Sequence, residues 1–134
     1  MNPYLKNLKK IEFVVTMACT GKCRHCSEGN HDGFTEHIDK TVAAEAVRKI
    51  CSSYEISTVM TFGGEPLLYP DTVCAIHKTA ASLGVAKRQA SQTGFSQRTE
   101  ARSELLRCVW PTVASMLCCC PWTRFIRKPF LSIQ

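Results

Sequence analysis

The stretch IEFVVTMACTGKCRHC, residues 11–26, joins an apolar run to three closely spaced cysteines. Its first five residues, IEFVV, have the length and the branched apolar side chains that are typical of a buried parallel strand. Cys19, Cys23 and Cys26 follow directly, in the spacing CxxxCxxC. The sequence therefore predicts a strand that leads into a loop carrying three thiols.

Helical and strand patterns alternate after this loop. A helix capped by Asp39 or Thr41 is predicted to end near Tyr54. Its buried face is predicted to consist of four apolar residues, Val42, Ala46, Val47 and Ile50. The next segment, ISTVMTF at residues 56–62, is rich enough in β-branched residues to form a second strand.

A second motif, GGEP at residues 63–66, follows the second predicted strand. A second helix is predicted over roughly residues 71–83, with Gly84 as its C-terminal cap. Alternation of this kind predicts an α/β fold, with parallel strands joined by right-handed crossovers in an open sheet or a barrel. Functional groups of such folds gather at the C-terminal ends of the strands, where both motifs fall.

Composition favours a soluble globular protein that works in the cytoplasm. The chain has 134 residues, of which 45% are hydrophobic and 21% charged, and its net charge of +6 is dispersed rather than clustered, which argues against nucleic-acid binding. The apolar run at residues 11–19 is interrupted by Glu12 and is too short to span a bilayer. Without export, the nine cysteines are expected to stay reduced, which favours metal or redox chemistry over disulfides.

The thiol loop fits two kinds of metal site. Structural zinc needs four ligands, and Cys19, Cys23 and Cys26 with His31 could supply them in a small zinc-binding interaction module. His25 is adjacent to Cys26 and points elsewhere in most loop geometries. A [4Fe-4S] cluster usually takes four thiolates, so three would leave one iron open to a further ligand.

CTGKCRHC at residues 19–26, followed about forty residues later by GGEP, each after a strand, resembles the radical S-adenosylmethionine (radical SAM) superfamily. The resemblance implies a partial (β/α)6 barrel, of which residues 8–88 match the N-terminal portion. It implies a [4Fe-4S] cluster that reductively cleaves S-adenosyl-L-methionine to a 5'-deoxyadenosyl radical. It also implies an electron donor such as flavodoxin or ferredoxin, whereas the substrate is not indicated.

Site residues follow from the same resemblance. Three cluster ligands are implied, Cys19, Cys23 and Cys26. Five cofactor-binding residues are implied, His25, which would pack on the adenine, and Gly63, Gly64, Glu65 and Pro66, which would bind the methionine amino group. The chemistry agrees, since glycines permit close backbone approach and a carboxylate accepts hydrogen bonds from an ammonium group. No residue is assigned a catalytic role.

The alternating pattern stops at about Gln89, although the family places a third strand near Val85. Residues 89–134 contain both tryptophans and the run CCCPW, without an amphipathic period. A shifted reading frame permits TNGFF across residues 92–96 and LLLSVDAFHQ across residues 117–128, and these strings resemble the family's third and fourth strands. We therefore interpret residues 1–88 as the barrel portion and the remainder as an aberrant tail, either frameshift-derived or disordered, with a divergent but genuine segment as the alternative.

Other cysteines and histidines are given structural roles. Cys51 and Cys74 fall in predicted helices and are expected to be small buried hydrophobic residues. His77 is expected at the surface. An auxiliary cluster at Cys108 and residues 118–120 is disfavoured, because adjacent thiols cannot converge on a tetrahedral site.

The resemblance covers only the first third of a barrel, which has an energetic consequence. A sheet edge and apolar strand faces would be left uncovered. The polypeptide is therefore predicted to be unstable or aggregated and not to cleave S-adenosylmethionine.

Overall fold

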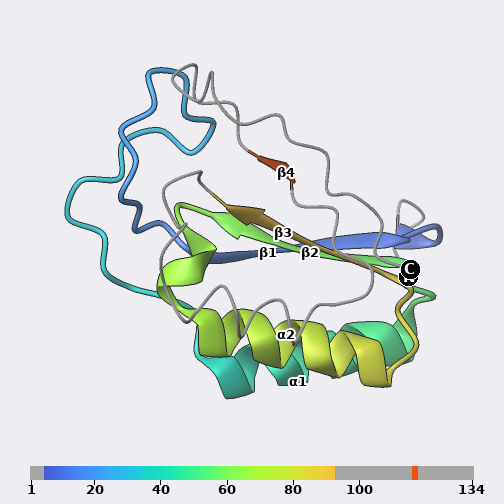
Figure 1. Cartoon of the computed structure of the whole chain (residues 1–134). Coiled ribbons are helices and arrows are strands. Elements are labelled where there is room, and N and C mark those ends of the chain that lie inside the picture. The colour runs from blue at the N-terminus through green and yellow to red at the C-terminus, as the bar shows by residue number, and fades with distance from the viewer. Residues whose placement is uncertain (1–4, 93–115, 118–134) are drawn as a thin grey trace, which may run out of the picture.

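The structure, a computed structural model, describes residues 5–92 and 116–117. These residues form a mixed α/β unit in which strands and helices alternate along the chain, as the sequence predicts (Figure 1). In chain order the elements are β1 (Lys10–Thr16), α1 (Lys40–Ser53), β2 (Thr58–Gly63), the short 3-10 helix η2 (Pro66–Leu68), α2 (Pro70–Ser82), β3 (Lys87–Gln92) and β4 (Met116–Leu117).

The strands form a parallel sheet in the order β1-β2-β3-β4, so that each strand pairs with the one before it in the chain. Lys10 of β1 lies opposite Thr58 of β2, and Thr58 lies opposite Lys87 of β3. Parallel neighbours need a crossover connection, and α1 and α2 supply the first two on the same face of the sheet (Figure 1). The C-terminal ends of β1 and β2 therefore lie side by side at one edge.

The hydrophobic core lies between the sheet and the two helices. Alternate residues of β1 and β2 point into it and pack against residues of the helices. The fully buried members are Val15, Ala43, Val47, Val59, Val73, Ile76 and Ala80. Full burial of each large apolar side chain contributes about 1.5–3 kcal/mol. Because this core packs β1 and β2 against the helices, it fixes the positions of their C-terminal ends.

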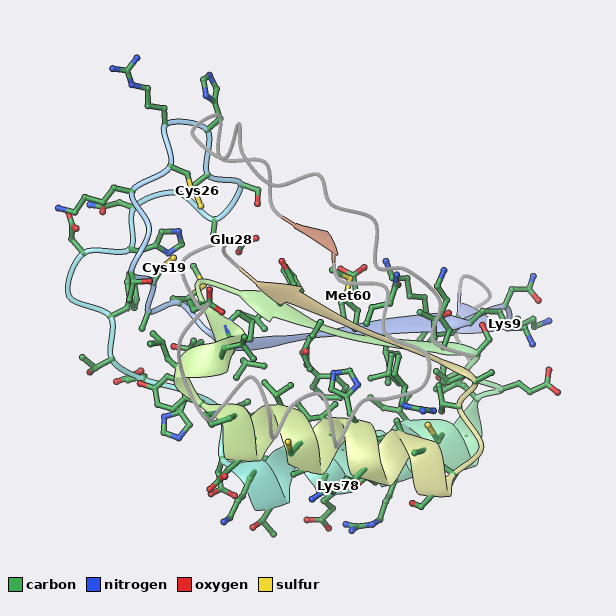
Figure 2. All side chains as sticks on the ribbon, in the orientation of Figure 1. Lys9, Cys19, Cys26, Glu28, Met60 and Lys78 are labelled. Atoms are coloured by element: carbon green, nitrogen blue, oxygen red, sulfur yellow. The ribbon has the colours of Figure 1, made fainter. Side chains whose placement is uncertain are left out.

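The opposite face of the sheet has a different composition. Lys10 and Glu12 of β1 form an ion pair there, and the neighbouring Val14 is 44% exposed. Met60 of β2 points away from the helices (Figure 2). No helix of the described residues lies on this face, so it is more open to solvent than the helix-covered face.

Helix α1 begins where the sequence predicts but buries a different stripe. Asp39 is the cap, since its carboxylate accepts hydrogen bonds from the N–H groups of Thr41 (2.8 Å) and Val42 (3.1 Å). The prediction that Val42 is buried is wrong, because it is 58% exposed, and the buried residues are Ala43, Ala44 and Val47. Helix α1 packs against α2 as well as against the sheet, and the small alanine side chains permit this close approach.

His77 is a second correction, since it has no exposed surface. Helix α2 is covered on most sides, and the ring of His77 lies under the sheet within 3.1 Å of the Thr61 hydroxyl. Its Nδ1 has no hydrogen-bond partner in the part of the chain that the structure describes. Burial, with a smaller contribution from the Arg88 charge, lowers the pKa of His77 to about 4.

This burial predicts a pH-dependent stability. Between pH 6.5 and 4 the unfolded chain binds a proton at His77 that the folded chain does not, so stability falls as the pH falls through this window. We expect the group to remove about 3 kcal/mol of unfolding free energy between pH 7 and pH 4. Urea unfolding at both pH values should show this loss, and H77Q should be less sensitive to pH by that amount. The exposed control H37Q should behave as the unchanged protein, and an equal pH response of H77Q would contradict the prediction.

Candidate metal centre

Both sequence motifs lie at the edge where β1 and β2 end (Figure 1). The cysteine loop, defined here as residues 17–36, leaves the end of β1. The GGE turn, defined here as residues 63–65, closes β2 and leads into η2. The sheet therefore brings together two motifs that are far apart in the sequence.

The cysteine loop returns to the strand end from which it leaves. The N–H of Ile38 donates to the carbonyl oxygen of Val15 (3.0 Å), and the Thr16 hydroxyl donates to the carbonyl oxygen of Glu36 (2.6 Å). Both contacts lie at the last two residues of β1. The loop is consequently closed at its base, and its thiols stay near the edge of the sheet.

Tyr69, at the start of α2, holds the same returning segment. Its hydroxyl donates to the carbonyl oxygen of Thr35 (2.6 Å), and its ring stacks on His37 with 3.8 Å between ring centroids. A surface cleft of about 390 Å³ lies beside this pair, and Lys40 and Asp71 contribute to its walls. The sequence predictions assign no site to this cleft.

The GGE turn binds directly to the backbone that leads into the cysteine loop. The N–H of Gly64 donates to the carbonyl oxygen of Thr16 (2.7 Å), and the N–H of Glu65 donates to that of Ala18 (2.8 Å). Ala18 is the residue immediately before Cys19. These two hydrogen bonds fix the position of the second motif relative to the first thiol.

Close backbone approach explains both glycines. A Cβ atom on Gly63, whose φ is 120°, would lie 2.3 Å from the carbonyl oxygen of Thr16. A Cβ atom on Gly64 would lie 2.1 Å from the carbonyl oxygen of Ala18 and 2.7 Å from that of Met17. Real Cβ atoms do not approach backbone oxygens this closely. Both positions require glycine because they lie against the carbonyl oxygens of residues 16–18, whether or not a ligand is bound.

Glu65 is buried, with 2% of its surface exposed. Its Oε1 accepts a hydrogen bond from the N–H of Leu67 (3.1 Å) and so caps η2, whose first residue is the buried Pro66. The carboxylate therefore has a local structural role. Its interaction with a methionine ammonium group stays a prediction.

The three thiols lie in one region without meeting at one point. Cys19 and Cys23 line a cavity of about 260 Å³ together with His31 and Asp32. Cys26 is not part of this lining, but its Sγ lies 2.8 Å from Nε2 of His31. His25 is exposed on the same loop. Within residues 5–92 and 116–117, no three side chains that could be metal ligands are grouped as an ion would require.

His31 is the residue that the radical SAM motifs do not identify. Its Nε2 lies 2.8 Å from Sγ of Cys26, and its Nδ1 lies 2.8 Å from the carbonyl oxygen of Met17. The hydrogen bond between the two side chains lowers the pKa of the Cys26 thiol and raises the pKa of His31, so each favours the charged form of the other. The sequence points to His31 only as a fourth zinc ligand, because nothing in the spacing indicates a contact with Met17.

The comparisons with known proteins add no family. No family model matches the chain, and no curated protein matches it. Across the part of the chain that the structure describes, the helices are too short or too polar to cross a membrane.

The cysteines outside the loop behave as small core residues. Cys74 of α2 is buried, as predicted, and Cys51 of α1 is partly buried against the core. Burial raises the pKa of the Cys51 thiol, which makes it a poor metal ligand at neutral pH. Cys108 and residues 118–120, at which an auxiliary cluster is disfavoured by the sequence, lie outside the described residues. Beyond Gln92 the structure describes only β4, so the interpretation of the tail stays a prediction.

Chemically, the donor set of the loop suits a thiolate-bound metal centre. Three cysteines within eight residues supply soft sulfur ligands, and none of them forms a disulfide. Two of them already face one cavity, and the exposed Lys22 and Arg24 lie beside them in the chain. The residues therefore fit an iron–sulfur cluster or a zinc ion in composition.

Proposed function

We propose that this chain forms the N-terminal portion of a radical SAM barrel and that its cysteine loop holds a [4Fe-4S] cluster next to an S-adenosylmethionine site. The contact between the GGE turn and the cysteine loop carries this proposal. Gly64 and Glu65 donate backbone hydrogen bonds to Thr16 and Ala18, so a cofactor bound at the turn would lie close to a cluster bound by the loop.

Strand order supports the barrel. Parallel strands that pair in chain order, with both crossover helices on one face, are what a (β/α) barrel requires, whereas doubly wound sheets change direction and carry helices on both faces. The helix-free face, with Glu12 and Met60, would then line the barrel interior. The described strands would correspond to the beginning of such a barrel.

Different residues would bind the cluster and the cofactor. Cys19, Cys23 and Cys26 would hold the cluster, which when bound supplies the electron for cleaving S-adenosylmethionine to a 5'-deoxyadenosyl radical. The GGE turn would place the methionine end of the cofactor, and His25 would contact its adenine. Glu65 caps η2 through Oε1, and its carboxylate would also accept a hydrogen bond from the methionine ammonium group.

Anaerobic reconstitution of the full chain with iron and sulfide tests the cluster. We expect about four iron atoms and about four sulfide ions per chain, the content of one [4Fe-4S] cluster. Because the described strands cannot enclose a cofactor, we expect no sustained release of 5'-deoxyadenosine when S-adenosylmethionine and a reductant are added. Sustained turnover would contradict the second expectation, and a chain that takes up no iron would contradict the proposal itself.

One observation favours a second candidate, a small zinc-binding interaction module. The Nε2 atom of His31 lies beside Cys26, where a fourth tetrahedral ligand would be needed. This candidate predicts a colourless protein with about one zinc ion per chain when it is purified without added iron. The same metal analysis therefore distinguishes the two functions.

A further inference from the structure

His31 connects two parts of the candidate metal centre that are separate in the sequence. One ring nitrogen lies 2.8 Å from Sγ of Cys26, five residues earlier, and the other lies 2.8 Å from the carbonyl oxygen of Met17, fourteen residues earlier. Met17 directly follows β1. The imidazole ring therefore bridges the third thiol and the end of a core strand.

The chemistry of the two contacts fixes the orientation of the ring. A carbonyl oxygen can only accept a hydrogen bond, so Nδ1 of His31 must donate its proton to Met17. Nε2 then faces the sulfur of Cys26. In histidines that bind a metal directly, donation of the other ring N–H to a backbone carbonyl fixes the orientation of the ring. The contact with Met17 fixes the ring of His31 in the same way, but here the second nitrogen faces a thiol.

The carbonyl oxygen of Met17 lies against the GGE turn. It lies against Gly64, where a Cβ atom would approach it to 2.7 Å, and it is flanked by the carbonyl groups that accept hydrogen bonds from Gly64 and Glu65. A continuous series of contacts therefore runs from the GGE turn through Met17 and His31 to Cys26.

We propose that His31 is a positioning residue that sets the place of Cys26 relative to the GGE turn and thereby prepares the cysteine loop for metal. The inference rests on the proposed metal-binding role of the loop and is incompatible with the zinc candidate, in which His31 is itself a ligand. Cys26 lies in a stretch without a helix or strand, so ordering its side chain in advance lowers the entropic cost of binding. His31 acts on the metal through Cys26 and is not itself a ligand.

Anaerobic titration of the full chain with Co²⁺ tests this role, because thiolate-to-cobalt charge-transfer absorption reports the bound cysteines directly. We expect H31A to bind Co²⁺ at least about tenfold more weakly than the unchanged protein, as is usual for the loss of a group that orients a ligand. H31N places an amide nitrogen near Nδ1 and H31Q places one near Nε2, so each should restore part of the affinity. The exposed K49A, in α1 and outside the cysteine loop, should bind as the unchanged protein does. Thermal unfolding without metal checks that every variant is folded.

The outcomes separate this inference from the proposed function. Equal Co²⁺ affinity of H31A and the unchanged protein would overturn it, as would an absence of thiolate–cobalt absorption in the unchanged protein. A change in the ligand-field bands of H31A at saturation would also overturn it, because His31 would then be a metal ligand. If reconstitution yields no iron–sulfur cluster but H31A still weakens Co²⁺ binding, the cluster proposal fails and the positioning role of His31 stands.

Discussion

Gly64→Ala is expected to destabilise the fold by about 3 kcal/mol or more, a large part of the 5–15 kcal/mol that usually separates folded from unfolded domains. The added Cβ would meet the carbonyl oxygen of Ala18 at 2.1 Å. Neither partner can yield cheaply, because both atoms belong to backbone that is tied by hydrogen bonds between the GGE turn and β1. Urea unfolding followed by circular dichroism measures the loss.

Gly29→Ala is the matched control for this substitution. Gly29 lies in the cysteine loop with a φ of 78°, and a Cβ atom there would meet nothing within 4 Å. Alanine at Gly29 adds only the strain of a left-handed backbone, about 1–2 kcal/mol. If G64A proves no more destabilising than G29A, close contact with the backbone of Met17 and Ala18 is not the reason for a glycine at position 64.

Replacing Cys19, Cys23 and Cys26 together by alanine is expected to abolish cluster binding, with at least about tenfold less iron per chain after reconstitution. These are the only thiols of the cysteine loop, and iron–sulfur clusters depend on thiolates. Because the three side chains contribute nothing to the hydrophobic core, stability without metal should change little. Iron and sulfide analysis, with urea unfolding of the metal-free protein, measures both effects.

Cys51→Ala is the control for the cysteine replacement. Its thiol lies in α1, packed partly against the core, and is not part of the cavity at the cysteine loop. The C51A protein should take up as much iron as the unchanged protein. Equal iron in the triple variant would show that the metal binds elsewhere and would contradict the proposed centre.

Sequence patterns predicted the elements of this fold well and their packing less well. The order of strands and helices, the Asp39 cap and the end of α2 before Gly84 all follow from local signals, because caps and turns depend on a few neighbouring residues. The buried stripe of α1 and the burial of His77 depend on how the helices pack against each other and the sheet. No local pattern contains that information.

For the candidate site, the sequence indicates the residues of the two motifs but not the contacts between them. CxxxCxxC and GGEP identified the residues, because ligand spacing is written in consecutive positions. The hydrogen bonds of Gly64 to Thr16 and of Glu65 to Ala18 join distant positions, as does the contact of His31 with Met17, so only the structure reveals them. They give the glycines a reason that does not depend on a cofactor.

The order of the strands also affects how the unit can fold while it is being synthesised. Since each strand pairs with its predecessor, no described strand waits for a partner that is synthesised much later. Each parallel pairing still joins residues that are far apart in the sequence, such as Lys10 and Thr58. Sequential pairing nevertheless allows the sheet to form one unit at a time as the chain emerges. The GGE turn would be synthesised after the cysteine loop. Its hydrogen bonds to Thr16 and Ala18 would then form while later residues were still being translated.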